Sequence, residues 1–251
     1  MKKLIALFLL ICLPANAAPD CQQLPDCEAY GYTCSADDCS GLKTLSCPFD
    51  ESKKICWPEA KECEVGSLLF DDFKCYDVAC GRTPIAVVFD TENRLARQLH
   101  FGKDHQKTVT GDNKSILGID IPELENCATA DEAKTTCGTD GKANTKIIID
   151  YITANGLSYI PAEYCYYSTF GGLPEGSWWL PSAKEIAFLH ENMDPVIATL
   201  GRYGISLTIY ENWTSTERNL EYMVGVRIRT GAITSHIKAP GSSHIDCIIG
   251  Y

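Results

Sequence analysis

The sequence has few long apolar runs and few basic residues, and both shortages exclude classes of protein. Its most apolar run, residues 4–13, is too short to span about 30 Å of hydrocarbon. Lysine and arginine number 22 against 33 aspartates and glutamates, a formal net charge of -11. This charge repels phosphate backbones and anionic membranes, and no Lys/Arg cluster offers a local exception. We therefore expect neither nucleic acid nor a membrane surface as a partner.

Motifs that indicate catalysis or cation binding are also absent. The chain contains no Gly-x-Ser-x-Gly, no glycine-rich phosphate loop, no EF-hand spacing and no Cys-x2-Cys pair. Ser182 could be a nucleophile only with an activating base, and it is better explained as a helix cap. We therefore predict no catalytic residues, no cofactor and no metal site.

Residues 1–17 have the three parts of a secretory signal peptide. Lys2 and Lys3 precede the apolar run, and Ala15-Asn16-Ala17 forms a small-residue cleavage site. We expect cleavage after Ala17 and no membrane insertion afterwards. The predicted location is outside the cell, on its surface or in a periplasm.

Cysteine usage divides the mature chain into two zones. Cleavage would remove Cys12 and leave 13 of the 14 cysteines in an oxidising compartment, where disulfides are the expected use. Residues 18–63 hold seven of them and few aliphatic side chains, so cross-links worth roughly 2–4 kcal/mol each must stabilise that module. Spacing does not determine the pairing, and an odd total leaves a thiol free or bonded to another chain. The candidates are Cys21, Cys27, Cys34, Cys39, Cys47, Cys56, Cys63, Cys75, Cys80, Cys127, Cys137, Cys165 and Cys247.

Residues 64–251 have the texture of an ordinary α+β domain. Helical spacing over 142–155 ends at Gly156, and Ser182 with Glu185 predicts a capping box for a second helix. Residues 102–127 are predicted as a long surface loop. Other expected helices span 162–167 and 195–203, and expected strands span 68–70, 84–89, 95–100, 221–229, 232–237 and 244–249. We therefore predict three parts: the signal peptide 1–17, a cysteine-rich module 18–63 and a domain 64–251.

An ordered set of short strings resembles one known family. Trp179-Leu180-Pro181-Ser182 with Glu185-Ile186, then Trp213-Thr214-Ser215-Thr216, then a closing strand with Cys247, resemble the Lcl C-terminal domain family. The resemblance implies a C-type-lectin-like fold, in which two helices flank a small twisted antiparallel sheet. At least two of Trp178, Trp179 and Trp213 are expected in its core.

Function is not determined by this fold, because it also houses the enzyme that makes formylglycine. That role requires a closely spaced copper-binding cysteine pair near the C-terminal end, where Cys247 stands alone. The Glu-Pro-Asn, Gln-Pro-Asp and Trp-Asn-Asp triplets of calcium-dependent lectins are absent, so calcium-bridged sugar binding is not expected.

Mixed polar and aromatic side chains surround the Trp213–Thr216 motif, as on a recognition surface. In relatives with this fold that region faces the ligand. An ordinary polar loop between strands is the alternative interpretation. The candidate ligand-binding residues are Tyr210, Asn212, Glu217, Arg218, Asn219 and Tyr222.

These features together predict a secreted or surface-exposed binding protein that recognises an extracellular glycan or protein without catalysis. Two alternatives stay open. One is a structural cell-envelope protein assembled through disulfides, and the other is an enzyme on a formylglycine-generating-like scaffold.

Overall fold

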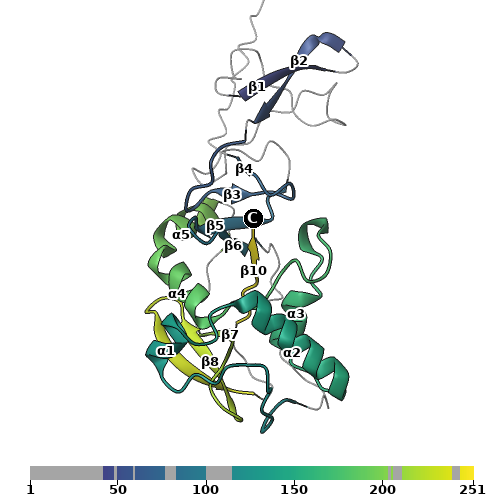
Figure 1. The fold of residues 1–251 in the computed structure, drawn as a ribbon. Coiled ribbons are helices and arrows are strands. Elements are labelled where there is room, and N and C mark those ends of the chain that lie inside the picture. Colours follow the sequence, from purple (N-terminus) through teal and green to yellow (C-terminus); the bar gives the residue numbers. More distant parts are fainter. Residues whose placement is uncertain are drawn as a thin grey trace, which may run out of the picture.

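The computed structural model describes residues 42–47, 50–58, 60–76, 83–99, 115–202, 205, 211–238 and 244–251, the first two ranges by backbone pairing alone. These residues form three small antiparallel sheets and five α-helices (Figure 1). The predicted α+β class is therefore confirmed. The expected signal peptide, Cys21, Cys27, Cys34, Cys39, Cys80 and Tyr210 lie outside the described residues.

A hairpin is described within the predicted cysteine-rich module. Strand β1 (Leu42–Cys47) pairs antiparallel with β2 (Asp50–Pro58), and Leu42 lies opposite Pro58. The register shifts between Ser46 and Cys47.

The larger sheet has the strand order β10-β6-β5-β3-β4 and is antiparallel throughout. Strand β5 (Ala86–Asp90) is buried along its whole length, as its apolar run predicts. The predicted turn after it forms because the Asp90 carboxylate accepts the backbone N–H groups of Glu92 and Asn93, both at 3.0 Å. The remaining strands are β3 (Leu68–Leu69), β4 (Cys75–Tyr76), β6 (Leu95–Gln98) and β10 (Ile248–Gly250).

The second sheet has the order β7-β8-β9 and comes from the C-terminal part of the chain. Its strands are β7 (Glu211–Glu217), β8 (Tyr222–Arg227) and β9 (Ala232–Ile237).

An isolated antiparallel bridge between Trp179 and Ile248 connects the segment before the fourth helix to β10 of the larger sheet.

Local sequence signals set the helix ends. Helix α2 (Gly141–Asn155) begins where the Asp140 carboxylate accepts the N–H of Ala143, and it ends at Gly156 in the left-handed conformation. The predicted capping box of Ser182 and Glu185 starts α4 (Ala183–Glu191). The other helices are α1 (Ala130–Thr135), α3 (Ile160–Tyr166) and α5 (Met193–Arg202).

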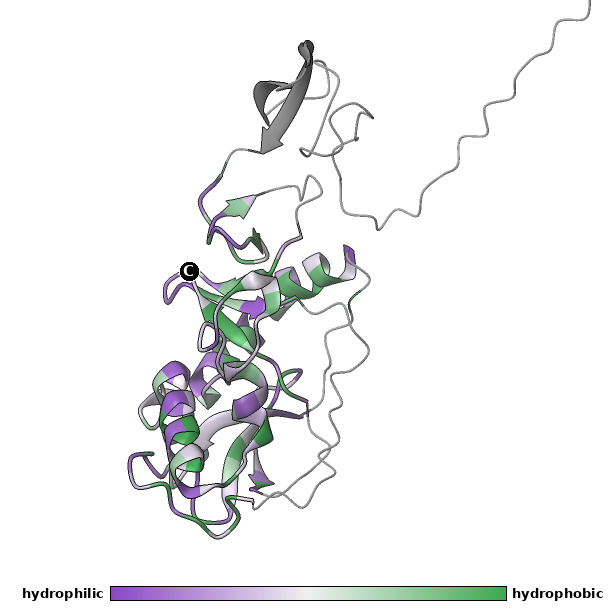
Figure 2. Cartoon of the chain, turned by 90° about the vertical axis from the view of Figure 1, so that its right-hand side faces the viewer, coloured by the Kyte–Doolittle hydropathy of each residue, from purple (hydrophilic) through white to green (hydrophobic). Residues whose placement is uncertain are grey.

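Figure 1 shows the α2–α3 pair and the α4–α5 pair on opposite sides of β10. Hydrophobic residues dominate the strands of the larger sheet, whereas the helices carry both hydrophobic and hydrophilic residues (Figure 2). Trp178, Trp179 and Trp213 are all buried, as expected for the core. Among the residues described, no helix has the length and apolar character needed to cross a membrane.

The described part of the predicted surface loop 102–127 is a loop that is anchored in the core. Residues 115–127 contain no helix or strand and most of them are exposed, as predicted, but the side chains of Ile116, Ile121 and Leu124 are buried. The sequence does not predict this burial, because the three side chains follow neither a helical nor a strand period. Residues 102–114 lie outside the described ranges.

Three disulfides join described cysteines, which confirms that disulfides are the use of these residues. They are Cys63–Cys75, Cys127–Cys137 and Cys165–Cys247, with sequence separations of 12, 10 and 82 residues. Cys63, which its spacing grouped with the front module, is thus bonded to strand β4 of the larger sheet.

Candidate functional site

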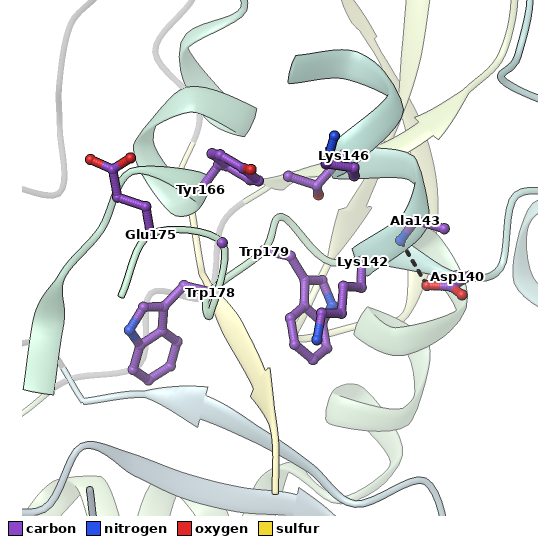
Figure 3. Close-up of a pocket in the computed structure, with 10 residues that line it drawn as sticks. Asp140, Lys142, Ala143, Lys146, Tyr166, Glu175, Trp178 and Trp179 are labelled. Carbon is purple, nitrogen blue, oxygen red and sulfur yellow. Dashed lines mark hydrogen bonds between the residues drawn. The ribbon is translucent and has the colours of Figure 1, made fainter. Parts of the chain in front are cut away.

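A partly open cavity of about 550 Å³ lies between the start of α2 and the segment leading to Trp179, and we call it the α2 pocket (Figure 3). Three aromatic side chains line it: Tyr166, Trp178 and Trp179. Its charged lining residues are Asp140, Lys142, Lys146 and Glu175.

The two tryptophans form the fixed base of the α2 pocket, and their rings are buried. The indole N–H of Trp178 donates to the carbonyl of Phe170 at 3.0 Å, and the side chain has no exposed surface. Trp179 is held through its backbone, which exchanges hydrogen bonds of 3.1 Å with Ile248. Because both rings are anchored by other segments, the base of the pocket is formed before any ligand arrives.

Tyr166 is the accessible aromatic group of the pocket. It is half-buried at the end of α3 and meets Tyr167 edge to face, with ring centroids 5.2 Å apart. A Cβ on Gly176 would lie 3.3 Å from the Tyr166 ring, and Gly176 has φ +79°, so the loop approaches the ring at a position that suits glycine. Figure 3 shows Glu175 beside Tyr166 on this side of the pocket.

Lysine side chains provide the positive charge of the pocket. Lys142 is exposed, and its Nζ lies 5.3 Å from the centroid of the Trp179 ring. Lys146 Nζ contacts the Asp150 carboxylate at 2.5 Å, and this hydrogen bond raises the pKa of Lys146. The opening therefore presents amines, a carboxylate and a phenol above a base of indole rings.

Glu185 supports the pocket from beneath. Its Oε2 accepts the backbone N–H of Ser182 at 2.6 Å, and its Oε1 accepts the indole N–H of Trp179 at 3.3 Å. Burial raises the pKa of Glu185 to about 7. A Cβ on Gly141 would lie 2.1 Å from Oε2, so only glycine lets α2 begin this close to the carboxyl group.

The lining chemistry suits noncovalent recognition. The pocket offers ring faces, hydrogen-bond donors and acceptors, and charges of both signs, and its described lining contains no thiol, imidazole or serine hydroxyl. Within the described ranges, no group of three or more His, Cys, Asp or Glu side chains is arranged to hold a metal ion.

Four of the ligand-binding residues predicted from sequence lie at or beside the β7–β8 turn, Asn212 lies at the start of β7, and none of these five lines the α2 pocket. Asn212 is 0% exposed and Glu217 is 1% exposed, which corrects the expectation that they belong to an exposed surface. They are buried because β7 packs against helices and against the segment before α1, so its polar side chains face the interior. Tyr210 lies outside the described residues.

The remaining candidates form the turn itself. Asn219 accepts the backbone N–H groups of Glu221 and Tyr222 through its side-chain oxygen, at 2.9 and 3.0 Å. Arg218 donates to Ser235 Oγ, and Tyr222 is half-buried. Ligand binding remains a prediction for Arg218, Asn219 and Tyr222.

Sequence reasoning missed the α2 pocket because three separate segments build it. Lys142 comes from α2, Tyr166 from α3 and Glu175 from the loop that follows. The available signals were the two adjacent tryptophans and the glycine-rich turn 171–176, and neither indicates which distant side chains join them.

No protein-family model matches the chain, and no curated protein matches it. Among solved structures it is similar to a fimbrial protein from Bacteroides ovatus, with 14% sequence identity and a TM-score of 0.47. The match covers 75% of this chain and 49% of the fimbrial protein, so the chain spans about half the length of that protein. A similarity at this TM-score carries no argument about function.

Proposed function

We propose that this protein is a secreted or surface-exposed binding protein that holds an extracellular glycan in the α2 pocket, without catalysis. The observation that carries the proposal is the pocket itself, a cavity of about 550 Å³ with an anchored aromatic base and a charged, hydroxyl-bearing opening. Ligand cavities of roughly 300–1,000 Å³ with such a mixed lining are typical of small-molecule sites.

A sugar suits this lining for a chemical reason. A pyranose ring has an apolar C–H face, which packs on aromatic rings, and hydroxyl edges that both donate and accept hydrogen bonds. Tyr166 provides the accessible ring, and Lys142 and Glu175 provide a donor and an acceptor at the opening.

The disulfides support the proposed location. Cross-links that join segments as distant as Cys165 and Cys247 form and persist in oxidising compartments, such as the cell exterior and the periplasm. We include the signal peptide at residues 1–17 and the C-type-lectin-like fold of the Lcl C-terminal domain family in the proposal. The strand–helix–strand order and the position of β10 in one sheet with β3 and β5 support that fold.

Binding of the oxidised chain 18–251 to an array of glycans and sulfated polysaccharides, with and without a chelator, tests the proposal. A saturable signal that survives chelation is expected. Tyr166→Ala and Lys142→Ala should each weaken binding by about tenfold, because each removes a direct contact.

A matched control is available for the lysine. Lys184 also lies over an aromatic ring, with its Nζ 5.9 Å from the Phe188 centroid, but it does not line the pocket. Lys184→Ala should therefore bind as the unmodified protein does. If Arg218→Ala with Tyr222→Ala abolishes binding and the pocket variants do not, the site is the β7–β8 turn and the pocket assignment is overturned.

A structural envelope role is the second candidate, and the odd number of cysteines in the predicted mature chain favours it. Non-reducing mass analysis distinguishes the two roles. Covalent oligomers with no bound glycan would support assembly, whereas a monomer with an alkylatable thiol would contradict it.

A further inference from the structure

A lysine amine and a glutamate carboxyl group are enclosed together at one end of the three-stranded sheet. Lys238 Nζ is in direct contact with Glu217 Oε1, and both side chains are 0% exposed. Glu217 is the last residue of β7, and Lys238 directly follows β9. The contact therefore joins the two outer strands, which β8 separates.

Backbone hydrogen bonds hold both residues in place. Lys238 N donates to Glu221 O at 2.8 Å, and Ser115 Oγ donates to Lys238 O. Cys127 N donates to Glu217 O at 3.0 Å. These bonds hold the backbones of the two residues, and the enclosure of both side chains keeps the amine and the carboxyl group in contact.

If Lys238 and Glu217 form an ion pair, too few hydrogen-bond partners surround its charged atoms. Glu217 Oε2 is buried and has no hydrogen-bond partner within the described part of the chain. The ammonium group has three N–H donors, and the acceptors that contact it are Glu217 Oε1 and Ile119 O, the latter at 2.8 Å. A buried ion pair recovers its desolvation cost only when further hydrogen bonds satisfy the remaining atoms.

Burial also favours the neutral form of Lys238. It lowers the pKa of Lys238 to about 8, against the opposing charge of Asp120. Proton transfer from the ammonium to the carboxylate removes both charges from the interior and produces a neutral amine in contact with a carboxylic acid.

We propose that Lys238 and Glu217 condense into an intramolecular amide cross-link. The Nζ lone pair attacks Cδ of the protonated Glu217 carboxyl group, so that a C–N bond forms. One C–O bond then breaks, and that oxygen leaves as water with two hydrogens from the original ammonium and carboxylate pair. Nothing is oxidised or reduced, and no co-reactant is consumed.

The product improves the local bonding. The remaining amide N–H keeps the hydrogen bond to Ile119 O, the two buried charges disappear, and water is excluded from a site without exposed surface. A second buried pair, Arg97 with Asp246, cannot react in this way, because a guanidinium is not deprotonated in proteins. The amide would connect β7 and β9 through a bond that reducing agents do not cleave.

Mass spectrometry of the secreted, reduced and alkylated chain tests the proposal. The intact mass should be lower than the sequence mass by one water molecule. A tryptic digest should contain a branched peptide that joins the Glu217 and Lys238 peptides, with no cleavage after Lys238. A full intact mass with linear peptides and a free Lys238 amine would overturn it.

Lys238→Arg provides the variant arm, because it keeps the positive charge and cannot condense. It should restore the full mass, whereas the control Lys146→Arg, at an exposed ion pair, should retain the water loss. Water loss that persists in Lys238→Arg lies elsewhere and contradicts the proposal. If Lys238→Arg does not fold, the peptide map of the unmodified protein still decides the question.

Discussion

Strand β5 of the larger sheet and strand β7 of the second sheet are both buried, but by different chemistry. Strand β5 buries Val87, Val88 and Phe89, whose stability comes from apolar area removed from water. Strand β7 buries Thr214 and Thr216 in a run of polar residues, each of which must find hydrogen bonds to offset its desolvation. Buried apolar side chains can pack against many different neighbours. Buried polar side chains need hydrogen-bond partners at particular positions.

The partners of β7 are the segments that build the α2 pocket. Thr216 Oγ accepts the backbone N–H of Ala183 at 3.0 Å and donates to the carbonyl of Gly138 at 3.1 Å. Ser182 Oγ donates to the carbonyl of Thr139 at 2.8 Å. The polar sheet thus positions the starts of α4 and α2, so its directed bonds matter more for the site than for total stability.

Disulfide removal should show the largest difference between the two regions. In the chain-entropy model the Cys165–Cys247 bond, at a separation of 82, contributes about 4.5 kcal/mol to the free energy of unfolding. The Cys127–Cys137 bond beside β7, at a separation of 10, contributes about 2.7 kcal/mol. Urea unfolding of the two Cys→Ala double variants checks this order, and equal losses would show that loop entropy does not govern these bonds.

The pH dependence of Glu185 tests the junction between the sheets. Its folded pKa of about 7 lies above the usual 4.5, so the native state keeps a proton that the unfolded state has lost. The contribution of Glu185 to stability should therefore fall by about 3 kcal/mol as the pH rises from 4.5 to 7.

Glu185→Gln lacks this titration and preserves an acceptor for the indole N–H of Trp179. Its free energy of unfolding, measured with urea between pH 5 and pH 8, should increase relative to that of the unmodified protein as the pH rises. Parallel pH profiles of the two proteins would show that Glu185 titrates normally. Glu191→Gln, at an exposed position of the same helix, is the control.

The smallest expected effect is that of a single hydroxyl in β7. Thr214 Oγ donates to Val224 O at 2.6 Å and accepts the N–H of Thr216 at 3.2 Å. Thr214→Val keeps the shape but removes a hydrogen bond from each of two buried backbone groups, so it should cost about 1–3 kcal/mol. Thr153→Val, at an exposed position of α2, should stay within about 0.5 kcal/mol in the same unfolding measurement.

Sequence patterns predicted the elements whose signals are local. Gly156 marked the end of α2, Ser182 with Glu185 marked the start of α4, and the apolar run marked β5. Strand β7 is not among the strands expected from sequence, because Thr214 and Ser215 have neither the apolar run nor the alternation that identifies a strand. The burial of Asn212 and Glu217 was missed for the same reason.

The sequence by itself determined the charge, the wealth of cysteines, the α+β class and the positions of the capped helices, because each depends on composition or on residues close together in the chain. Tertiary structure decided which cysteines pair, which polar side chains are buried, and that Lys142, Tyr166 and Glu175 share one pocket. These contacts join residues far apart in the chain. Their free energy depends on the geometry of the assembled partners, which no local pattern records.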